Sequence, residues 1–417
     1  METNTNKSTV RVITCGSVDD GKSTLIGRLM YDCKAIFEDQ LKEIKNASFK
    51  RGKENIDLSL LTDGLKEERE RGITIDVAYR YFSTPKRKFI FADTPGHKEF
   101  TRNMITGASG VSAAILLIDS KRGITEQTIR HAYVNAILNI PHIIVCINKM
   151  DLNDYNEEIF NSIKNDFEKK IISKLKFETV HYIPVSALYG DNVTNKSEKT
   201  IWYQGHSLLT TLEDFKVKDE YQNKCLRFNI QQSFTWEGRE SVFLGNILSG
   251  KIKRNDKLKL VPDMRELTVS KIELKGKEIS EARAGQSIQV FINDGIEINN
   301  YGVLTDCKEL PMIYSMEINC MLFWFSEQVL QKGDQLIFQS ISTICSCTII
   351  KILGKTDPET LQISNDALEL CTNDFGTAEI RTTEKIFFDK YSENRFTGSF
   401  LLIHPETNET LAGGIIM

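Results

Sequence analysis

The sequence predicts an α/β phosphate-loop (P-loop) domain with a doubly wound, mainly parallel sheet, followed by two antiparallel β-barrels. Three observations predict this architecture. Residues 16–24 match the pattern G-x-x-x-x-G-K-[ST] without a mismatch. From residue 113 onward, apolar runs of strand length alternate with amphipathic runs of helix length, which is typical of βαβ units. Beyond Asp219, short alternating runs are separated by Gly, Asn and Asp turns, which indicates antiparallel barrels.

Composition and charge narrow the class of protein. The chain has 417 residues, 41% hydrophobic and 26% charged, which is typical of a soluble protein with several domains. Its formal net charge of −4 provides no general basic field, so we expect no nucleic-acid partner. The polar start lacks the apolar segment of a signal peptide, and the longest apolar runs are far shorter than the roughly 20 residues of a membrane span. We therefore expect a cytoplasmic protein that does not contact a membrane.

Periodicity and turn residues predict the individual elements. In the P-loop domain, strands are expected at residues 10–15, 78–83, 88–92, 113–118, 143–147 and 181–185, and helices at 25–33, 126–138 and 156–175. Barrel strands are expected at residues 226–230, 242–248, 257–260, 267–274 and 287–292, and then at 315–325, 335–338, 346–352 and 399–403. The predicted domains are residues 1–219, 220–307 and 308–417.

A nucleoside triphosphate is the expected ligand of residues 16–24. This loop joins an apolar strand to an amphipathic helix, so its backbone N–H groups and the helix dipole favour a phosphate. Lys22 places a positive charge at the β- and γ-phosphates, and the Ser23 hydroxyl is a suitable ligand for Mg2+. The predicted phosphate-binding residues are Gly16, Ser17, Val18, Asp19, Asp20, Gly21, Lys22, Ser23 and Thr24.

A second segment follows the apolar strand at residues 88–92. At the strand end, Asp93 is expected to hold Mg2+ through a water molecule. Gly96 allows a backbone N–H to approach the γ-phosphate, and His97 is expected to orient the attacking water. A solvated surface histidine is the alternative interpretation of His97. The residues predicted to contact the nucleotide here are Asp93, Thr94, Pro95, Gly96 and His97.

Two further segments predict which base is bound. Guanine presents N1–H and N2–H2 side by side, and a carboxylate such as Asp151 accepts from both, which favours GTP over ATP. Asn148 is expected to contact the base edge and brace the P-loop, and the Ala187 N–H to reach guanine O6. The predicted base-binding residues are Asn148, Lys149, Met150 and Asp151, together with Ser186, Ala187 and Leu188.

Residues 71–76 precede the strand at 78–83 and have the features of a switch segment. The Thr74 hydroxyl is expected to bind Mg2+ only when GTP is present, and its N–H to reach the γ-phosphate. Without the other motifs, an ordinary threonine at a strand entry would be the better interpretation. The predicted catalytic residues are thus Lys22, Thr74 and His97, and the predicted metal ligands are Ser23, Thr74 and Asp93.

The nine cysteines are scattered, which favours reduced thiols over a disulfide framework. Cys345 and Cys347 form the one close pair, and both would face the same side of a strand. A metal site there would need two more ligands brought near by the fold. Reduced core thiols are the favoured interpretation.

The five motifs together resemble the translation-factor class of GTPases, in which two β-barrels follow a GTP-binding domain. Within that class, the P-loop sequence GSVDDGK at residues 16–22 and the run TIDVAYRYFST at residues 74–84 look like those of the large, GTP-hydrolysing subunit of bacterial sulfate adenylyltransferase (CysN type). Residues 61–65, 101–104, 190–193, 389–391 and 395–400 are also similar to that family. The chain departs from the family pattern at residues 234–239 and at Tyr301, and both departures concern partner docking rather than GTPase chemistry.

The resemblance implies a regulatory GTPase whose cofactors are GTP and Mg2+. It also implies a partner, a smaller catalytic subunit (CysD type) that transfers the adenylyl group of ATP to sulfate. Because no second P-loop follows the barrels, we expect no fused adenylylsulfate kinase domain. Two alternatives remain: a translational GTPase of the elongation factor Tu type that delivers aminoacyl-tRNA, and a self-contained P-loop kinase. The acidic balance and Asp20 disfavour the first alternative, and Asp151 and the two barrels disfavour the second.

Overall fold

The structure is a computed structural model and describes most of the chain. The described residues are 8–50, 56–61, 76–97, 101–108, 110–215, 221–236, 240–261, 263–293, 302–306, 312–365 and 367–417. The chain divides into two compact units, one of residues 1–217 with 357–362 and one of residues 218–356 with 363–417. The predicted boundaries of the three domains stay predictions.

The first unit contains a sheet in the order β2-β3-β1-β4-β5-β6. β2 is antiparallel to β3, and the other neighbours are parallel. This arrangement confirms the predicted doubly wound, mainly parallel sheet. The strands are β1 (Thr9–Cys15), β2 (Ala78–Ser83), β3 (Lys88–Asp93), β4 (Ala113–Asp119), β5 (His142–Asn148) and β6 (Thr179–Pro184).

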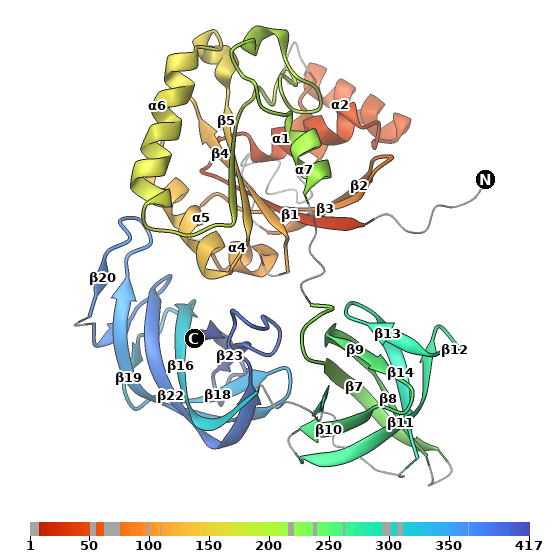
Figure 1. Cartoon of the computed structure of the whole chain (residues 1–417). Coiled ribbons are helices and arrows are strands. Elements are labelled where there is room, and N and C mark those ends of the chain that lie inside the picture. The colour runs from red at the N-terminus through yellow and green to blue at the C-terminus, as the bar shows by residue number, and fades with distance from the viewer. Residues whose placement is uncertain are drawn as a thin grey trace. The chain divides into compact units, whose positions relative to one another are not determined.

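Helices connect these strands and cover both faces of the sheet. They are α1 (Lys22–Asp32), α2 (Glu38–Lys50), α4 (Thr101–Ala108), α5 (Glu126–Ile137), α6 (Glu157–Phe167) and α7 (Leu208–Asp214), with short helical turns at Leu58–Leu61, Met150–Asn153, Glu168–Ile172 and Glu198–Thr200. The helix predicted at residues 156–175 is α6 followed by a π-helical turn at Glu168–Ile172. Figure 1 shows α1 and α7 on one side of the sheet and α5 and α6 on the other. No helix in the described ranges is long and apolar enough to cross a membrane.

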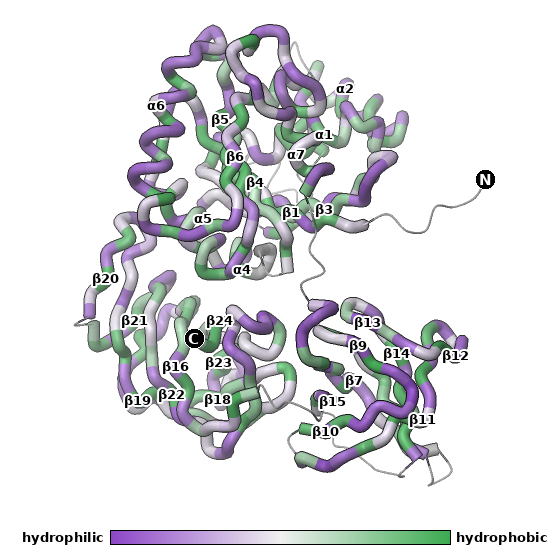
Figure 2. Tube along the Cα trace, in the orientation of Figure 1, coloured by the Kyte–Doolittle hydropathy of each residue, from purple (hydrophilic) through white to green (hydrophobic). Residues whose placement is uncertain are grey.

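The core of this unit explains why the sheet forms. Every residue of β4 is buried, which fits an apolar central strand covered on both faces. On one face, Leu25, Ile26 and Leu29 of α1 and Leu208 of α7 pack in one cluster with the strand residues. Figure 2 shows hydrophobic residues along the central strands, whereas α6 carries both hydrophobic and hydrophilic residues. The carboxyl ends of β1, β3, β5 and β6 therefore carry loops on a rigid support.

The second unit consists of two antiparallel barrels, as predicted. In each, six strands form a ring, because the first and sixth strands of the sheet order also pair with each other. The first ring is β10 (Lys257–Val261), β15 (Gly302–Asp306), β7 (Arg227–Trp236), β8 (Glu240–Ser249), β14 (Ser287–Ile292) and β11 (Arg265–Leu274). The second ring is β18 (Gln335–Ser340), β23 (Ser399–Ile403), β24 (Thr410–Ile416), β16 (Ile313–Trp324), β22 (Phe375–Phe388) and β19 (Ile344–Thr356). The remaining short strands are β9 (Lys251–Lys253), β12 (Lys277–Ile279), β13 (Glu281–Arg283), β17 (Leu330–Gln331), β20 (Ile363–Ser364) and β21 (Glu369–Leu370).

A buried ion pair lies inside the second unit. Nε and Nη2 of Arg227 donate to the two carboxylate oxygens of Asp389 at 2.9 and 2.8 Å. The two side chains are only 2% and 3% exposed. Nη1 of Arg227 donates to the Thr305 hydroxyl, and the Thr397 hydroxyl donates to Asp389. The guanidinium thus joins β7 of the first barrel to the segment after β22 of the second.

Candidate nucleotide site

The P-loop leaves β1 and leads directly into α1, as predicted. Gly21 precedes α1 with φ +93°, a left-handed conformation that favours glycine. A Cβ at this position would lie 2.5 Å from Nδ2 of Asn148, so the close approach also requires glycine. Lys22 begins the helix and its side chain is buried. Its Nζ donates to the carbonyl oxygens of Gly16 and Ser17, both at 3.0 Å, so the ammonium group is held within the loop.

The buried carboxylate of Asp20, in the P-loop, lies near the positive charge of Arg122. Asp20 is 2% exposed, and its Oδ2 accepts the Ser17 N–H at 2.7 Å. Arg122, which follows β4, donates to the Val18 carbonyl at 2.8 Å and lies 3.7 Å from Oδ1 of Asp20. Burial raises the pKa of Asp20, and the charge of Lys22 and the Ser17 hydrogen bond oppose that rise.

The predicted metal-binding segment lies beside the loop, at the end of β3. Oδ2 of Asp93 accepts from the Ser23 hydroxyl at 3.0 Å, and Oδ1 accepts from the Thr14 hydroxyl at 3.1 Å. Asp93 is 1% exposed. A Cβ on Gly96 would lie 2.8 Å from the backbone carbonyl oxygen of Gly16, so only a glycine fits this close to the loop. The segment therefore brings a carboxylate and a hydroxyl oxygen together next to the Lys22 ammonium.

The remaining predicted residues of these two segments differ in exposure. Thr94 is buried, and its hydroxyl donates to the Thr14 carbonyl at 2.6 Å. His97 is exposed and lies just past Gly96. Val18 and Thr24 are half-buried, Asp19 is exposed, and Pro95 is buried. Thr74 lies outside the described residues, as do residues 62–65, 237–239 and Tyr301.

Asn148, at the end of β5, joins the P-loop to the loop after β6. Its Nδ2 donates to the Asp20 carbonyl at 2.7 Å, and its Oδ1 accepts the Ala187 N–H at 2.9 Å. The residue is 1% exposed. The brace to the P-loop is as expected, whereas the Ala187 N–H, expected on guanine O6, donates here to a side chain of the protein. Asn148 thus ties the phosphate end of the site to its base end.

The proposed base-reading carboxylate is oriented by a neighbouring hydroxyl. The Ser186 hydroxyl donates to Oδ1 of Asp151 at 2.6 Å. Nζ of Lys149 pairs with Asp119 at the end of β4 at 2.8 Å. Met150 is fully buried, and Leu188 is 40% exposed. Hydrogen bonds therefore join residues 148–151 to residues 186–188.

Three residues at and near α5 contact the P-loop or the residue before it, and the sequence analysis did not predict them. Nδ1 of His131 accepts the Gly16 N–H at 2.9 Å, and the Thr125 hydroxyl lies 2.7 Å from that of Ser17. Nδ2 of Asn135 donates to Sγ of Cys15 at 3.2 Å. A sequence signal for two of them existed, because a histidine and an asparagine four residues apart share one face of the helix.

Burial determines the protonation states of the groups beneath the loop. His131 is 3% exposed, and burial, with the charges of Lys22 and Arg130, lowers its pKa to about 3. The imidazole is therefore neutral, which leaves Nδ1 free to accept the Gly16 N–H. Burial also raises the pKa of the Cys15 thiol to about 12, so Cys15 is an unreactive core thiol. The cysteines of the described ranges are all free.

Comparisons with known proteins agree with this geometry. The family model for the elongation factor Tu GTP binding domain matches residues 7–233, and the model for the GTP-eEF1A C-terminal domain-like family matches residues 317–417. Sulfate adenylyltransferase subunit 1 of Cellvibrio japonicus is 42% identical over 417 residues, covering 99% of this chain and 87% of that protein. The protein of the same name from Aliarcobacter butzleri is 43% identical over 413 residues, covering 99% of this chain and 88% of its own length.

A solved structure of sup35 complexed with GDP also aligns, at 22% identity and a TM-score of 0.45, over 99% of this chain and 94% of that one. With an elongation factor Tu type GTPase domain at its N-terminus, the chain belongs to the sulfate adenylyltransferase subunit 1 family.

Proposed function

We propose that this chain is the GTP-hydrolysing regulatory subunit of a sulfate adenylyltransferase. It couples GTP hydrolysis to the formation of adenylyl sulfate from ATP and sulfate on a separate, smaller catalytic subunit (CysD type). The observation that carries the nucleotide part is Asn148, whose side chain bonds both the P-loop and the loop at residues 186–188. The relatives named as subunit 1 support the existence of a partner subunit.

The phosphate half of the site is proposed to bind GTP with Mg2+. Ser23 and Asp93 fit this ion, because their oxygens lie 3.0 Å apart beside a buried lysine and carboxylate and hydroxyl oxygens are the ligands that Mg2+ prefers. When bound, the ion neutralises charge on the β- and γ-phosphates. Thr74 is proposed as a third ligand. Lys22 holds the phosphates by its charge, and His97 orients the attacking water.

The base half of the site is proposed to select guanine. The Asp151 carboxylate accepts from N1–H and N2–H2 of the base, and Ser186 keeps that carboxylate oriented through the 2.6 Å hydrogen bond. The stem of Lys149 packs on the ring, and its ammonium group is held by Asp119. A base without the N2 amino group loses one of these contacts, which makes inosine triphosphate a useful probe.

Coupling requires a physical difference between two nucleotide states. If the GTP and GDP forms bound the catalytic subunit's intermediates equally well, hydrolysis would shift no equilibrium. The formation of adenylyl sulfate is uphill in free energy. The GTP and GDP forms must therefore differ in their affinity for the partner's intermediates, and GTP hydrolysis provides the free energy for that difference. Release of a segment when the γ-phosphate leaves is the general way in which GTPases produce such a difference.

The direct test is to co-express the chain with a candidate small subunit and purify the complex. We expect sulfate-dependent adenylylation of ATP to rise when GTP is added, and Lys22→Ala to abolish both GTP binding and that rise. Lys170→Ala is the matched control, because Lys170 lies on the surface and its ion pair with Asp166, at 3.4 Å, joins two exposed side chains. An adenylylation rate that ignores GTP would contradict the proposal. Retention of aminoacyl-tRNA on filters by the GTP form would instead support a translational GTPase.

A further inference from the structure

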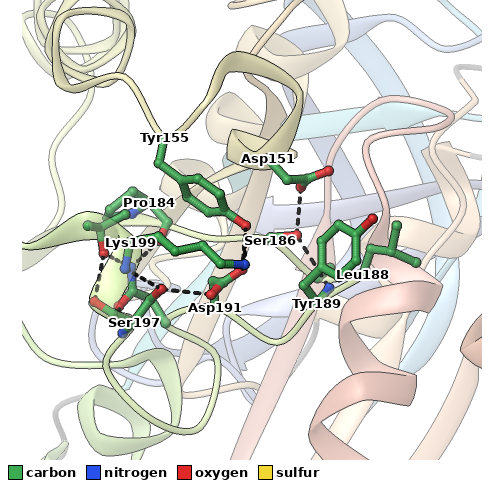
Figure 3. A network of polar contacts seen from close by, with 12 residues as sticks. Asp151, Tyr155, Pro184, Ser186, Leu188, Tyr189, Asp191, Ser197 and Lys199 are labelled. Atoms are coloured by element: carbon green, nitrogen blue, oxygen red, sulfur yellow. Dashed lines mark hydrogen bonds and ion pairs between the residues drawn. The ribbon is translucent and has the colours of Figure 1, made fainter.

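Asp191 lies outside the predicted nucleotide-binding residues but at the centre of a polar network (Figure 3). Its Oδ2 accepts from the Tyr155 hydroxyl at 2.5 Å and from Nζ of Lys199 at 3.2 Å. Its Oδ1 accepts from the Ser197 hydroxyl at 2.7 Å. The Asp191 side chain is 12% exposed, so these donors replace most of its contact with water. Such a set of donors on one carboxylate is more than a surface ion pair.

One arm of the network leads to the segment that carries Asp151. The Tyr155 N–H donates to the Met150 carbonyl at 3.0 Å, one residue before Asp151. The Tyr155 carbonyl accepts from Nε1 of Trp202 at 3.0 Å. Its φ of +55° is uncommon for a bulky residue, so the surrounding contacts must hold the backbone there. The phenol that reaches Asp191 is therefore anchored to the backbone next to the base-reading carboxylate.

The other arm leads to the loop that carries Ser186. The Ser186 N–H donates to the Asp191 carbonyl at 3.2 Å, and the Gly190 N–H donates to the Ser186 carbonyl at 2.7 Å. The Tyr189 N–H donates to the Ser186 hydroxyl at 3.3 Å. That hydroxyl in turn donates to Asp151, as Figure 3 shows. The side chain of Asp191 thus holds the segment that carries Asp151, through Tyr155, and its backbone holds the loop that carries Ser186.

The ammonium group of Lys199 contacts three members of the network. Its Nζ lies 4.9 Å from the ring centre of Tyr155 and 5.3 Å from that of Tyr189, as well as beside Asp191. Although burial alone would raise the pKa of Asp191, the hydrogen bonds from Tyr155, Ser197 and Lys199 and the Lys199 charge lower it. Asp191 is therefore ionised at neutral pH and accepts from all of these donors.

We propose that Asp191 is a positioning residue for guanine recognition, which fixes the Asp151 carboxylate by holding residues 148–155 and 186–191 together. This inference rests on the proposed binding of GTP. The reason is geometric, because a carboxylate accepts from N1–H and N2–H2 at once only when it lies in the plane of the base. Loss of the Tyr155 to Asp191 contact lets the Asp151 segment move relative to Ser186. The contact to the N2 amino group then weakens.

The test measures dissociation constants of GTP and inosine triphosphate for the full chain, by calorimetry. The variants are Asp191→Ala, Tyr155→Phe and the double variant. We expect the preference for GTP over inosine triphosphate to fall by about tenfold in each, the size of a partial loss of one charge-assisted hydrogen bond. The double variant should lose no more than either single one. Asp166→Ala, which removes an exposed carboxylate of α6 that lies 3.4 Å from Nζ of Lys170, should keep the wild-type preference.

Two results would overturn this inference. A variant that weakens GTP and inosine triphosphate equally shows a general structural role, and a variant that changes neither shows no role. Should Asp191→Ala fail to fold, Tyr155→Phe decides, because it removes one hydroxyl and keeps the ring. The wild type separates the two proposals. If it does not prefer GTP, the proposed function fails, whereas an unchanged preference in the variants refutes only the role of Asp191.

Discussion

The backbone N–H of Gly16 donates to Nδ1 of His131 at 2.9 Å, which connects the first residue of the P-loop to the middle of α5. The contact joins residues 115 positions apart in the chain. Because the imidazole is buried, its neutral state and the orientation of its ring are prerequisites for the position of Gly16. The helix beneath the loop is therefore part of the phosphate site, although none of its side chains was predicted to contact the nucleotide.

Replacing His131 tests this support. His131→Leu leaves the buried Gly16 N–H without an acceptor, at a cost of about 1–3 kcal/mol, and should weaken GTP binding as the loop shifts. His131→Gln offers an amide oxygen to the same N–H and should recover part of the loss. Calorimetric titration with GTP and thermal unfolding of both variants provide the measurement. Equal behaviour of the two variants would show that the acceptor is unimportant.

The same residue predicts a pH dependence of stability. The pKa of His131 falls from 6.5 to about 3 on folding, so between these values the unfolded chain binds the proton and the folded chain does not. The contribution of His131 is complete above pH 6.5 and is lost as the pH falls toward 3, by about 1.4 kcal/mol per pH unit. Relative to wild type, His131→Gln should therefore lose less stability between pH 6.5 and 5. Parallel unfolding curves for both proteins over this range would contradict the assignment.

Asp151→Asn should change the base that the site prefers. An amide N–H2 donates where the carboxylate accepted, so guanine loses its partner and xanthine, which presents an oxygen at position 2, gains one. We expect the preference to shift from GTP toward xanthosine triphosphate, measured by competition between the two nucleotides. Asp154→Asn is the control, since Asp154 is exposed and its φ of +51° suits asparagine equally well. A variant at position 151 that still selects GTP would remove Asp151 from base recognition.

His97→Ala should separate binding from hydrolysis. If His97 orients the attacking water, turnover should fall by about 10²- to 10⁴-fold, the usual contribution of such a group, while GTP affinity stays near wild type. Single-turnover hydrolysis and GTP titration measure the two quantities. His206→Ala provides a matched control, because His206 is also exposed and belongs to another loop of the same unit. Unchanged turnover would make His97 an ordinary surface histidine.

The buried pair of Arg227 and Asp389 should behave differently from a surface pair. Asp389→Ala leaves a buried guanidinium unpaired and should lower the free energy of unfolding by about 3–5 kcal/mol. Joint replacement by Met and Leu should cost much less, because no charge remains buried. In contrast, Glu317→Ala breaks a 2.6 Å pair with Arg381 whose side chains are more than half exposed, and should cost at most about 1 kcal/mol. Similar losses for both single variants, by calorimetry, would refute the distinction.

Local patterns predicted most of the strands and the site segments. The strand ends at residues 93 and 148 carry polar residues directly after apolar runs, and parallel strands bring such ends to one edge of the sheet. Other strands were not predicted, because charged residues interrupt their apolar pattern. β22 contains Arg381, Glu384 and Lys385, whose charges hide the alternation of its buried residues. Similarly, α2 lies in a polar segment for which the sequence analysis predicted no element.

By itself, the sequence predicted the class of ligand and the residues proposed to bind it, because a P-loop, a carboxylate after a strand and an N-K-x-D segment are short local patterns. Only the tertiary structure decided what holds them in place. Asn148 reaches Asp20 and Ala187, His131 reaches Gly16, and Asp191 joins the two base loops. These contacts depend on which buried donors and acceptors packing brings within 3 Å, and each must be satisfied once water is excluded. No periodicity in the chain encodes that pairing, since its partners lie tens to more than a hundred residues apart.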